Sequence, residues 1–238
     1  MDMARLPRAV ELVRGKARNP RWRPGLSAAL YSEIFASSRE ASGVGAALAL
    51  AGDTMRQQRR DAAEEKAILW VQDKEAIRLS GRPYRPGLPK AVRDRVIHVA
   101  AQSAADALFA LEEGLRCRDL ACVIGELAGN PRQFDFIASR RLALATEKHG
   151  VALFLVRLDA HAELSAARMR WRIAAAPSAP PLWNRNAPGR AAWRAELFRA
   201  RAHPPGEWIL RDDDPVLAAE SAAATAPDHG DLVRAAGA

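Results

Sequence analysis

Lysine is scarce in this chain: five of the 36 basic residues are lysines and the remaining 31 are arginines. Cysteine is scarcer still, with two residues among 238. Cys117 and Cys122 lie five positions apart, a spacing that matches no common zinc motif. So few cysteines predict reduced thiols and a cytoplasmic location.

Long apolar runs are also missing. No stretch of about 18 apolar residues occurs, so no membrane-spanning helix and no membrane contact are expected. Residues 1–23 are charged throughout and have no apolar centre, so they do not read as a secretory signal.

What the chain has in excess is positive charge. The net charge is +8 and the pI is near 10.3, while 49% hydrophobic and 27% charged residues are ordinary for a globular protein. Two interpretations stay open. The arginine and alanine excess is typical of a GC-rich genome, and it also fits a surface that binds nucleic acid or an acidic protein.

From about residue 30 to residue 157, short apolar runs alternate with segments whose apolar residues have helical periodicity. Strands are expected at 30–35, 67–72, 96–100, 120–125 and 151–157, and helices at 46–59, 103–116 and 133–149. This order predicts an α/β fold with right-handed βαβ units and a mostly parallel sheet flanked by helices. Three further segments, 168–173, 193–202 and 207–211, predict a half-exposed strand and a hairpin, and hence antiparallel C-terminal strands.

Three regions are expected. Residues 1–25 read as a basic N-terminal arm, residues 26–212 as one α/β domain, and residues 213–238, which are acidic, alanine-rich and aperiodic, as a disordered tail.

The small-residue loop 36–45 stands where an α/β protein cradles phosphate. A nucleotide triphosphatase needs a lysine and a Ser or Thr directly after the last glycine. Here two alanines follow Gly45, the loop has no lysine, and the strand-end acid is displaced to Glu126. We therefore expect a degenerate phosphate loop, no catalytic residue, no cofactor, and, because the five histidines are scattered, no metal site.

Arg141 falls on the expected apolar face of the helix 133–149. A buried unpaired charge is costly, so Arg141 is predicted to form an ion pair, with Glu126 as the nearest candidate in sequence. The alternative is that its stem packs while its guanidinium reaches solvent.

A set of arginines recurs at alternate positions in the last strands. Such a row predicts either contacts to DNA or to a partner protein, or merely a solvated sheet face. No aromatic side chain is expected between these arginines on that face. The members are Arg168, Arg170, Arg172, Arg199 and Arg201.

The element order and several motifs carry a family resemblance. ILWVQD (68–73), the segment 96–127 and the segment 138–157 are similar to successive strands and helices of the RecA-like core. The sequence motifs are more similar still to those of the ImuA family. These are RecA- and SulA-like proteins of bacterial mutagenesis cassettes. ALEEGLR, VIGE, SRRL and the hairpin ELFRARAHPPGEW all resemble ImuA motifs, and the resemblance covers about residues 25–212.

This resemblance implies a RecA-like domain acting as a non-enzymatic adaptor in damage-induced (SOS) mutagenesis. The partners that it implies are an ImuB-type protein, which is an inactive relative of Y-family polymerases, and through it an error-prone DnaE-type polymerase for translesion synthesis. RecA and weakly or indirectly bound DNA are further expected contacts. The alternative is a SulA-like inhibitor that binds the tubulin-like division protein.

Overall fold

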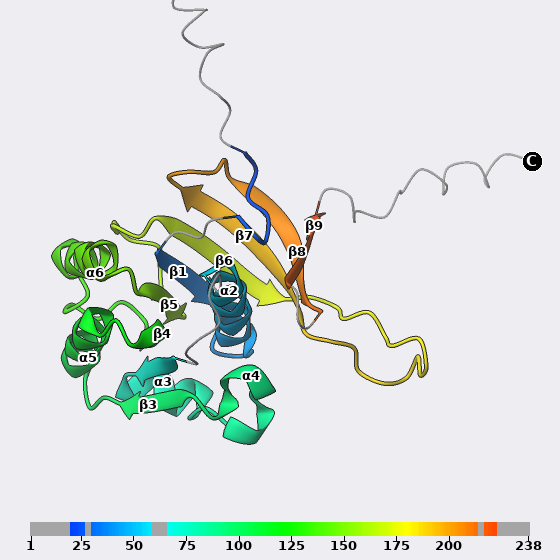
Figure 1. Cartoon of the computed structure of the whole chain (residues 1–238), viewed down its shortest axis with the longest axis horizontal. Helices are drawn as coiled ribbons and strands as arrows, with labels where there is room; N and C mark the ends of the chain where they lie inside the picture. The colour runs from blue at the N-terminus through cyan, green and yellow to red at the C-terminus, as the bar shows by residue number, and fades with distance from the viewer. Residues whose placement is uncertain (1–19, 27–29, 59–65, 214–216, 223–238) are drawn as a thin grey trace, which may run out of the picture.

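The computed structural model describes residues 20–26, 30–58, 66–213 and 217–222, and these build one sheet with helices on both faces (Figure 1). The spatial order of the strands is β3-β2-β4-β5-β1-β6-β7-β8-β9. Their bounds are β1 Tyr31–Ala36, β2 Ala67–Gln72, β3 Val96–Ala100, β4 Leu120–Ala128, β5 Ala152–Leu158, β6 Met169–Ala175, β7 Ala192–Ala200, β8 Gly206–Asp212 and β9 Leu217–Ser221.

The strands from β3 to β6 in this order all pair in parallel, whereas β7, β8 and β9 pair antiparallel. The predicted α/β class, with a mostly parallel sheet and antiparallel C-terminal strands, is confirmed. The central parallel strands β2, β4 and β5 read as nearly continuous apolar runs because both of their faces are buried.

Helices divide unequally between the two faces. α2 (Ser42–Gln58) packs on one face, and α5 (Ala104–Arg116) and α6 (Phe136–His149) pack on the other (Figure 1). The shorter elements α3 (Lys74–Ser80), η2 (Arg85–Gly87) and α4 (Lys90–Arg93) lie between β2 and β3 in the chain.

Local capping explains where α5 and α6 begin and end. Ser103 caps α5 and Asp135 caps α6, each accepting a hydrogen bond from a first-turn backbone N–H. Gly150 ends α6 with φ of 74°, a left-handed conformation that glycine adopts without strain.

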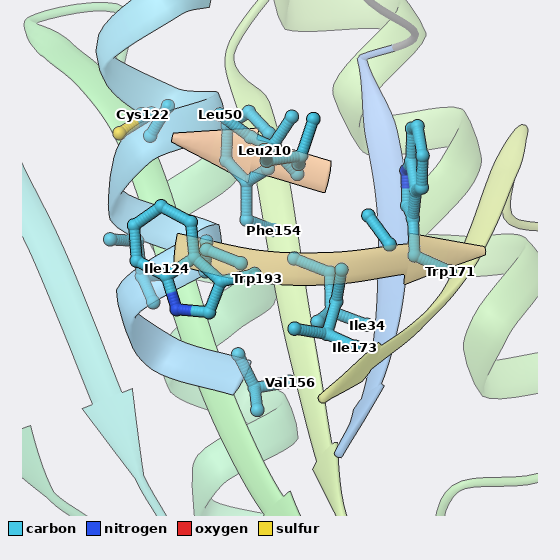
Figure 2. Close-up of a cluster of buried hydrophobic side chains, with 14 of the residues drawn as sticks. Ile34, Leu50, Cys122, Ile124, Phe154, Val156, Trp171, Ile173, Trp193 and Leu210 are labelled. Carbon is cyan, nitrogen blue, oxygen red and sulfur yellow. The ribbon is translucent and has the colours of Figure 1, made fainter. Parts of the chain in front are cut away.

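The core on the α2 face holds Ile34, Phe154, Trp171 and Trp193 together with residues of α2 itself (Figure 2). Trp22 joins this core: it is 3% exposed, and its ring centroid lies 4.7 Å from that of Trp171. The prediction that residues 1–25 form an arm is therefore wrong for Trp22, because the indole packs as a core residue. Residues 1–19 lie outside the described ranges.

The predicted tail also needs a correction. Leu217–Ser221 is not disordered but forms β9, which pairs antiparallel with β8 at the edge of the sheet. Leu217 is buried at 2% exposure, so burial of one leucine outweighs the polar, aperiodic surroundings that suggested disorder. Residues 223–238 lie outside the described ranges.

A β-bulge interrupts the pairing of β6 with β7. Arg170 pairs with Arg199 and Trp171 pairs with Leu197, so Phe198 is the extra residue on β7. Because of this extra residue, Phe198 and Arg199 both belong to the sheet face that carries Arg170.

In the described part of the chain, every helix is too short or too polar to cross a lipid bilayer.

Candidate partner-binding surface

A small cavity of about 290 Å³ lies at the carboxyl ends of β2, β4 and β5, beside the start of α2. This is the edge of a parallel α/β sheet where ligands usually bind. Its lining includes two carboxylates, Glu40 and Glu126, and one cationic side chain, Arg82. The charge balance of this cavity disfavours a polyanion such as a nucleoside triphosphate.

Glu126 is buried in the wall of this cavity at 1% exposure. Trp70 Nε1 and Gln72 Nε2 donate to its Oε1 at 2.6 and 3.0 Å, and Ser80 Oγ donates to its Oε2 at 3.2 Å. Burial raises the pKa of this carboxyl to about 7, although the three donors oppose the shift. Among the residues that the structure describes, the hydrogen-bond partners of Glu126 are neutral and no cation forms an ion pair with it.

The connection between β1 and α2 is short, and the start of α2 packs tightly against the sheet. α2 begins at Ser42, four residues earlier than predicted, and takes Gly43 and Gly45 into its first turn. A Cβ at Gly43 would lie 2.7 Å from Ala36 Cβ, and one at Gly45 would lie 2.9 Å from Trp193 Cζ2. Both glycines thus allow α2 to approach the sheet closely.

Asp159, just beyond β5, fixes the same connection. Its Oδ1 accepts a hydrogen bond from the Ser38 backbone N–H at 2.9 Å. Hydrogen bonds from Ser38 lower the pKa of Asp159, so the carboxylate is charged at neutral pH. A carboxylate from the chain itself therefore occupies the backbone N–H of Ser38.

The prediction that Arg141 pairs with Glu126 is wrong. Arg141 Nε donates to Glu112 Oε1 of α5 at 2.8 Å, and its side chain is 56% exposed. The expected apolar face was misplaced, because α6 buries Ala138, Ser139, Leu142, Ala143 and Thr146. Arg141 thus links two helices at the surface.

The predicted arginine row divides into three environments. Arg170 is buried and pairs with the fully buried Glu33, whose other oxygen accepts from Ser165 Oγ at 2.6 Å. Arg170 is therefore inaccessible to DNA or to a partner protein, and its guanidinium holds β6 to β1.

Arg172 lies on the open face of the antiparallel strands. It forms an exposed ion pair with Glu196, and its guanidinium carbon stands 4.3 Å from the centroid of the Phe198 ring. The expectation that no aromatic residue stands among the arginines is wrong, because the bulge turns Phe198 to this face.

Arg168, Arg199 and Arg201 meet at a groove of about 650 Å³ between α6, the start of β6 and the end of β7. Arg168 forms an ion pair with Glu147 of α6. The groove also carries large apolar side chains that sequence reasoning missed, namely Phe136, Leu144 and Leu164. The signal was the second apolar stripe of α6, in which Ile137 and Leu144 stand seven residues apart and face away from the core.

Comparison with known proteins shows which proteins this chain is similar to. No protein-family model matches the chain. Protein ImuA from Caulobacter vibrioides strain NA1000 / CB15N and Protein ImuA from strain ATCC 19089 / CIP 103742 / CB 15 are each 37% identical to it over 160 residues. Over this segment the chain is similar to the two ImuA proteins.

The aligned part is 61% of this chain and 60% of each relative, so the chain spans less than two thirds of the ImuA proteins that it matches. The resemblance to ImuA proteins that the motifs indicate is confirmed over this segment.

Proposed function

We propose that this protein, which resembles ImuA, is a non-catalytic adaptor in damage-induced mutagenesis. In this role it supports translesion synthesis by an ImuB-type protein and an error-prone DnaE-type polymerase. Similarity to Protein ImuA supports the biological setting, and the site at the carboxyl edge of the sheet supports the absence of catalysis.

The proposal that the protein is non-catalytic rests on the structure of the β1–α2 connection together with the burial of Glu126. Gly43 and Gly45 are used for packing, no lysine lines the adjoining cavity, and Glu126 is buried among neutral donors. Phosphoryl transfer depends on cations that neutralise the developing negative charge. This edge offers Arg82 alone among its lining residues.

We further propose that the core is RecA-like and that the β1–α2 connection is a degenerate phosphate loop. The succession from β1 through α2, β2, β3, α5, β4, α6 and β5 supports the first statement. The second is supported by the position of the connection at the carboxyl edge of the parallel strands, where a phosphate loop belongs.

Two experiments test the proposal. The full chain is co-expressed with the ImuB-type protein of the same genome and purified on a tag carried by the partner; a stable complex is expected. The tubulin-like division protein is the comparison bait, since a SulA-like inhibitor would bind it instead. A shortened chain that ends at residue 222 keeps β9 and tests whether residues 223–238 contribute to the complex.

Catalysis is tested with millimolar ATP and Mg²⁺. No thermal shift and no hydrolysis above background are expected. ATP turnover that disappears in Glu126→Gln would overturn the non-catalytic part while leaving the partner complex as a separate result.

A further inference from the structure

The groove between α6, β6 and β7 has an apolar surface that the fold leaves uncovered. Phe136 is 41% exposed, Leu144 is 55% exposed and Leu164 is 65% exposed, and all three line the same hollow. Single exposed apolar residues are common, whereas a cluster around a concavity is typical of a protein-binding site.

The rim of this groove is basic. Its lining includes four arginines and one acid, Glu147, which already pairs with Arg168. The guanidinium groups of Arg140, Arg199 and Arg201 have no acidic partner among the residues that the structure describes. Three positive charges therefore stand uncompensated around an apolar floor.

The floor is held in place from below. Ser165 Oγ donates to the buried Glu33 at 2.6 Å, and Ser139 Oγ of α6 accepts from the Ala166 backbone N–H at 2.8 Å. Glu33 is itself fixed by Arg170. These bonds tie the segment between β5 and β6 to the core, so binding in the groove costs little ordering of its floor.

We propose that this groove binds an acidic, amphipathic segment of a partner protein. Large apolar side chains of that segment cover Leu144 and Leu164. Its carboxylates pair with Arg140, Arg199 and Arg201. The inference rests on the proposed adaptor function and deepens it by assigning the surface and the chemistry of the segment that it receives.

Charge and shape favour a protein segment over nucleic acid. Phe136 has the one aromatic ring among the described residues that line the groove. Leu144 and Leu164 offer no stacking surface to bases, and a phosphate backbone gains nothing by covering these two leucines. A peptide with apolar and acidic residues matches both the floor and the rim.

The test uses a displayed library of random peptides of about 15 residues, long enough for four helical turns. The library is selected on the full chain, and the best binder is measured by fluorescence anisotropy. Selected peptides are expected to combine Asp or Glu with Leu, Phe or Trp. Leu144→Ser is expected to weaken their binding by about tenfold, as the loss of a central anchor does.

A double variant tests the contribution of the basic rim. Arg199→Glu with Arg201→Glu is expected to weaken peptide binding by at least about tenfold and to flatten its salt dependence. Matched controls come from the exposed loop between β6 and β7, where Leu182→Ser and Arg185→Glu should leave affinity unchanged. All four positions are exposed, so folding should survive, and circular dichroism checks it.

Peptides without this bias, or equal binding by the groove variants and the parent chain, would overturn the proposal. An oligothymidine that binds the parent and loses affinity with the arginine variant but not with Leu144→Ser would assign the groove to nucleic acid and also overturn it. If the ImuB-type protein fails to copurify while the peptides bind as expected, the adaptor function fails alone. If the complex forms equally well with the groove variants, and these bind the peptides as the parent does, the groove assignment fails alone.

Discussion

Arg170 Nε donates to Glu33 Oε2 across 2.8 Å, and the two side chains are 5% and 0% exposed. The pair joins β6 to β1, at the point where the parallel part of the sheet meets its antiparallel part. Removing one member of a buried pair leaves the other charge without compensation, and this is far more costly than losing an exposed pair.

We expect Arg170→Met to lower the free energy of unfolding by about 3–5 kcal/mol, because Glu33 stays buried without its cation. Arg172→Met breaks the exposed pair with Glu196 and should cost less than about 1 kcal/mol. Urea unfolding of both variants measures the difference. Equal losses would show that the guanidinium of Arg170 matters no more than a surface charge.

Glu126→Gln should remove one source of pH dependence. The folded protein holds a proton on Glu126 up to about pH 7, whereas the unfolded chain releases it near the ordinary value of 4.5. The parent therefore loses stability between about pH 4.5 and pH 8, by about 3 kcal/mol relative to the glutamine variant.

Urea midpoints for the parent and Glu126→Gln at pH 5 and pH 8 check this. The glutamine amide can donate to Ser80 while its oxygen accepts from Trp70 and Gln72 as before. Parallel pH curves for the two proteins would contradict the raised pKa.

Gly43→Ala should destabilise the fold by about 1–3 kcal/mol, since the new Cβ would stand 2.7 Å from Ala36 Cβ and 3.0 Å from Val156 Cγ1. Gly52→Ala in the same helix is the control. Its Cβ would meet only Arg56 Nη1 at 3.4 Å, so a gain of about 0.5–1 kcal/mol is expected from helix propensity. Thermal unfolding distinguishes the two signs.

Trp22→Ala should cost about 3 kcal/mol, as truncations of buried aromatic residues do. The ring centroid of this indole also stands 5.5 Å from that of Trp208, so the loss opens a hole beside Trp171 and Trp208. Trp183→Ala, at a site 81% exposed, should change stability by less than about 0.5 kcal/mol. Chemical denaturation followed by far-UV circular dichroism gives both values, and a mild effect at Trp22 would support the arm interpretation.

Local patterns were sufficient to predict most of the fold. β2 and β3 were predicted with their observed bounds, because each is a short apolar run between polar residues. The sequence predicts the start of α2 too late, because Gly43 and Gly45 are typical of a loop and their tight contacts depend on strands far away in sequence. Periodicity cannot reveal that a glycine is required for helix–sheet contact.

The candidate site was less predictable, because burial of a charged residue depends on partners in distant elements. Alternation placed Arg168, Arg170 and Arg172 on one face, and β6 confirms that the intervening residues Met169 and Trp171 are buried. It could not show that Glu33, 137 positions away, neutralises the middle arginine. The choice of Glu126 as a partner for Arg141 failed for the same reason, since nearness in sequence is a poor guide to nearness across helices.

The single extra residue in β7 has an evolutionary consequence. Side chains of a strand alternate between faces, so the bulge at Phe198 reverses the parity of every residue between it and the end of β7. Regular pairing of the same residues, without the bulge, would send Arg199 toward the tryptophan core and turn Ala200 outward. A homologue can therefore keep every arginine and still lose this basic rim, which makes the bulge a better marker of the surface than the composition of β7.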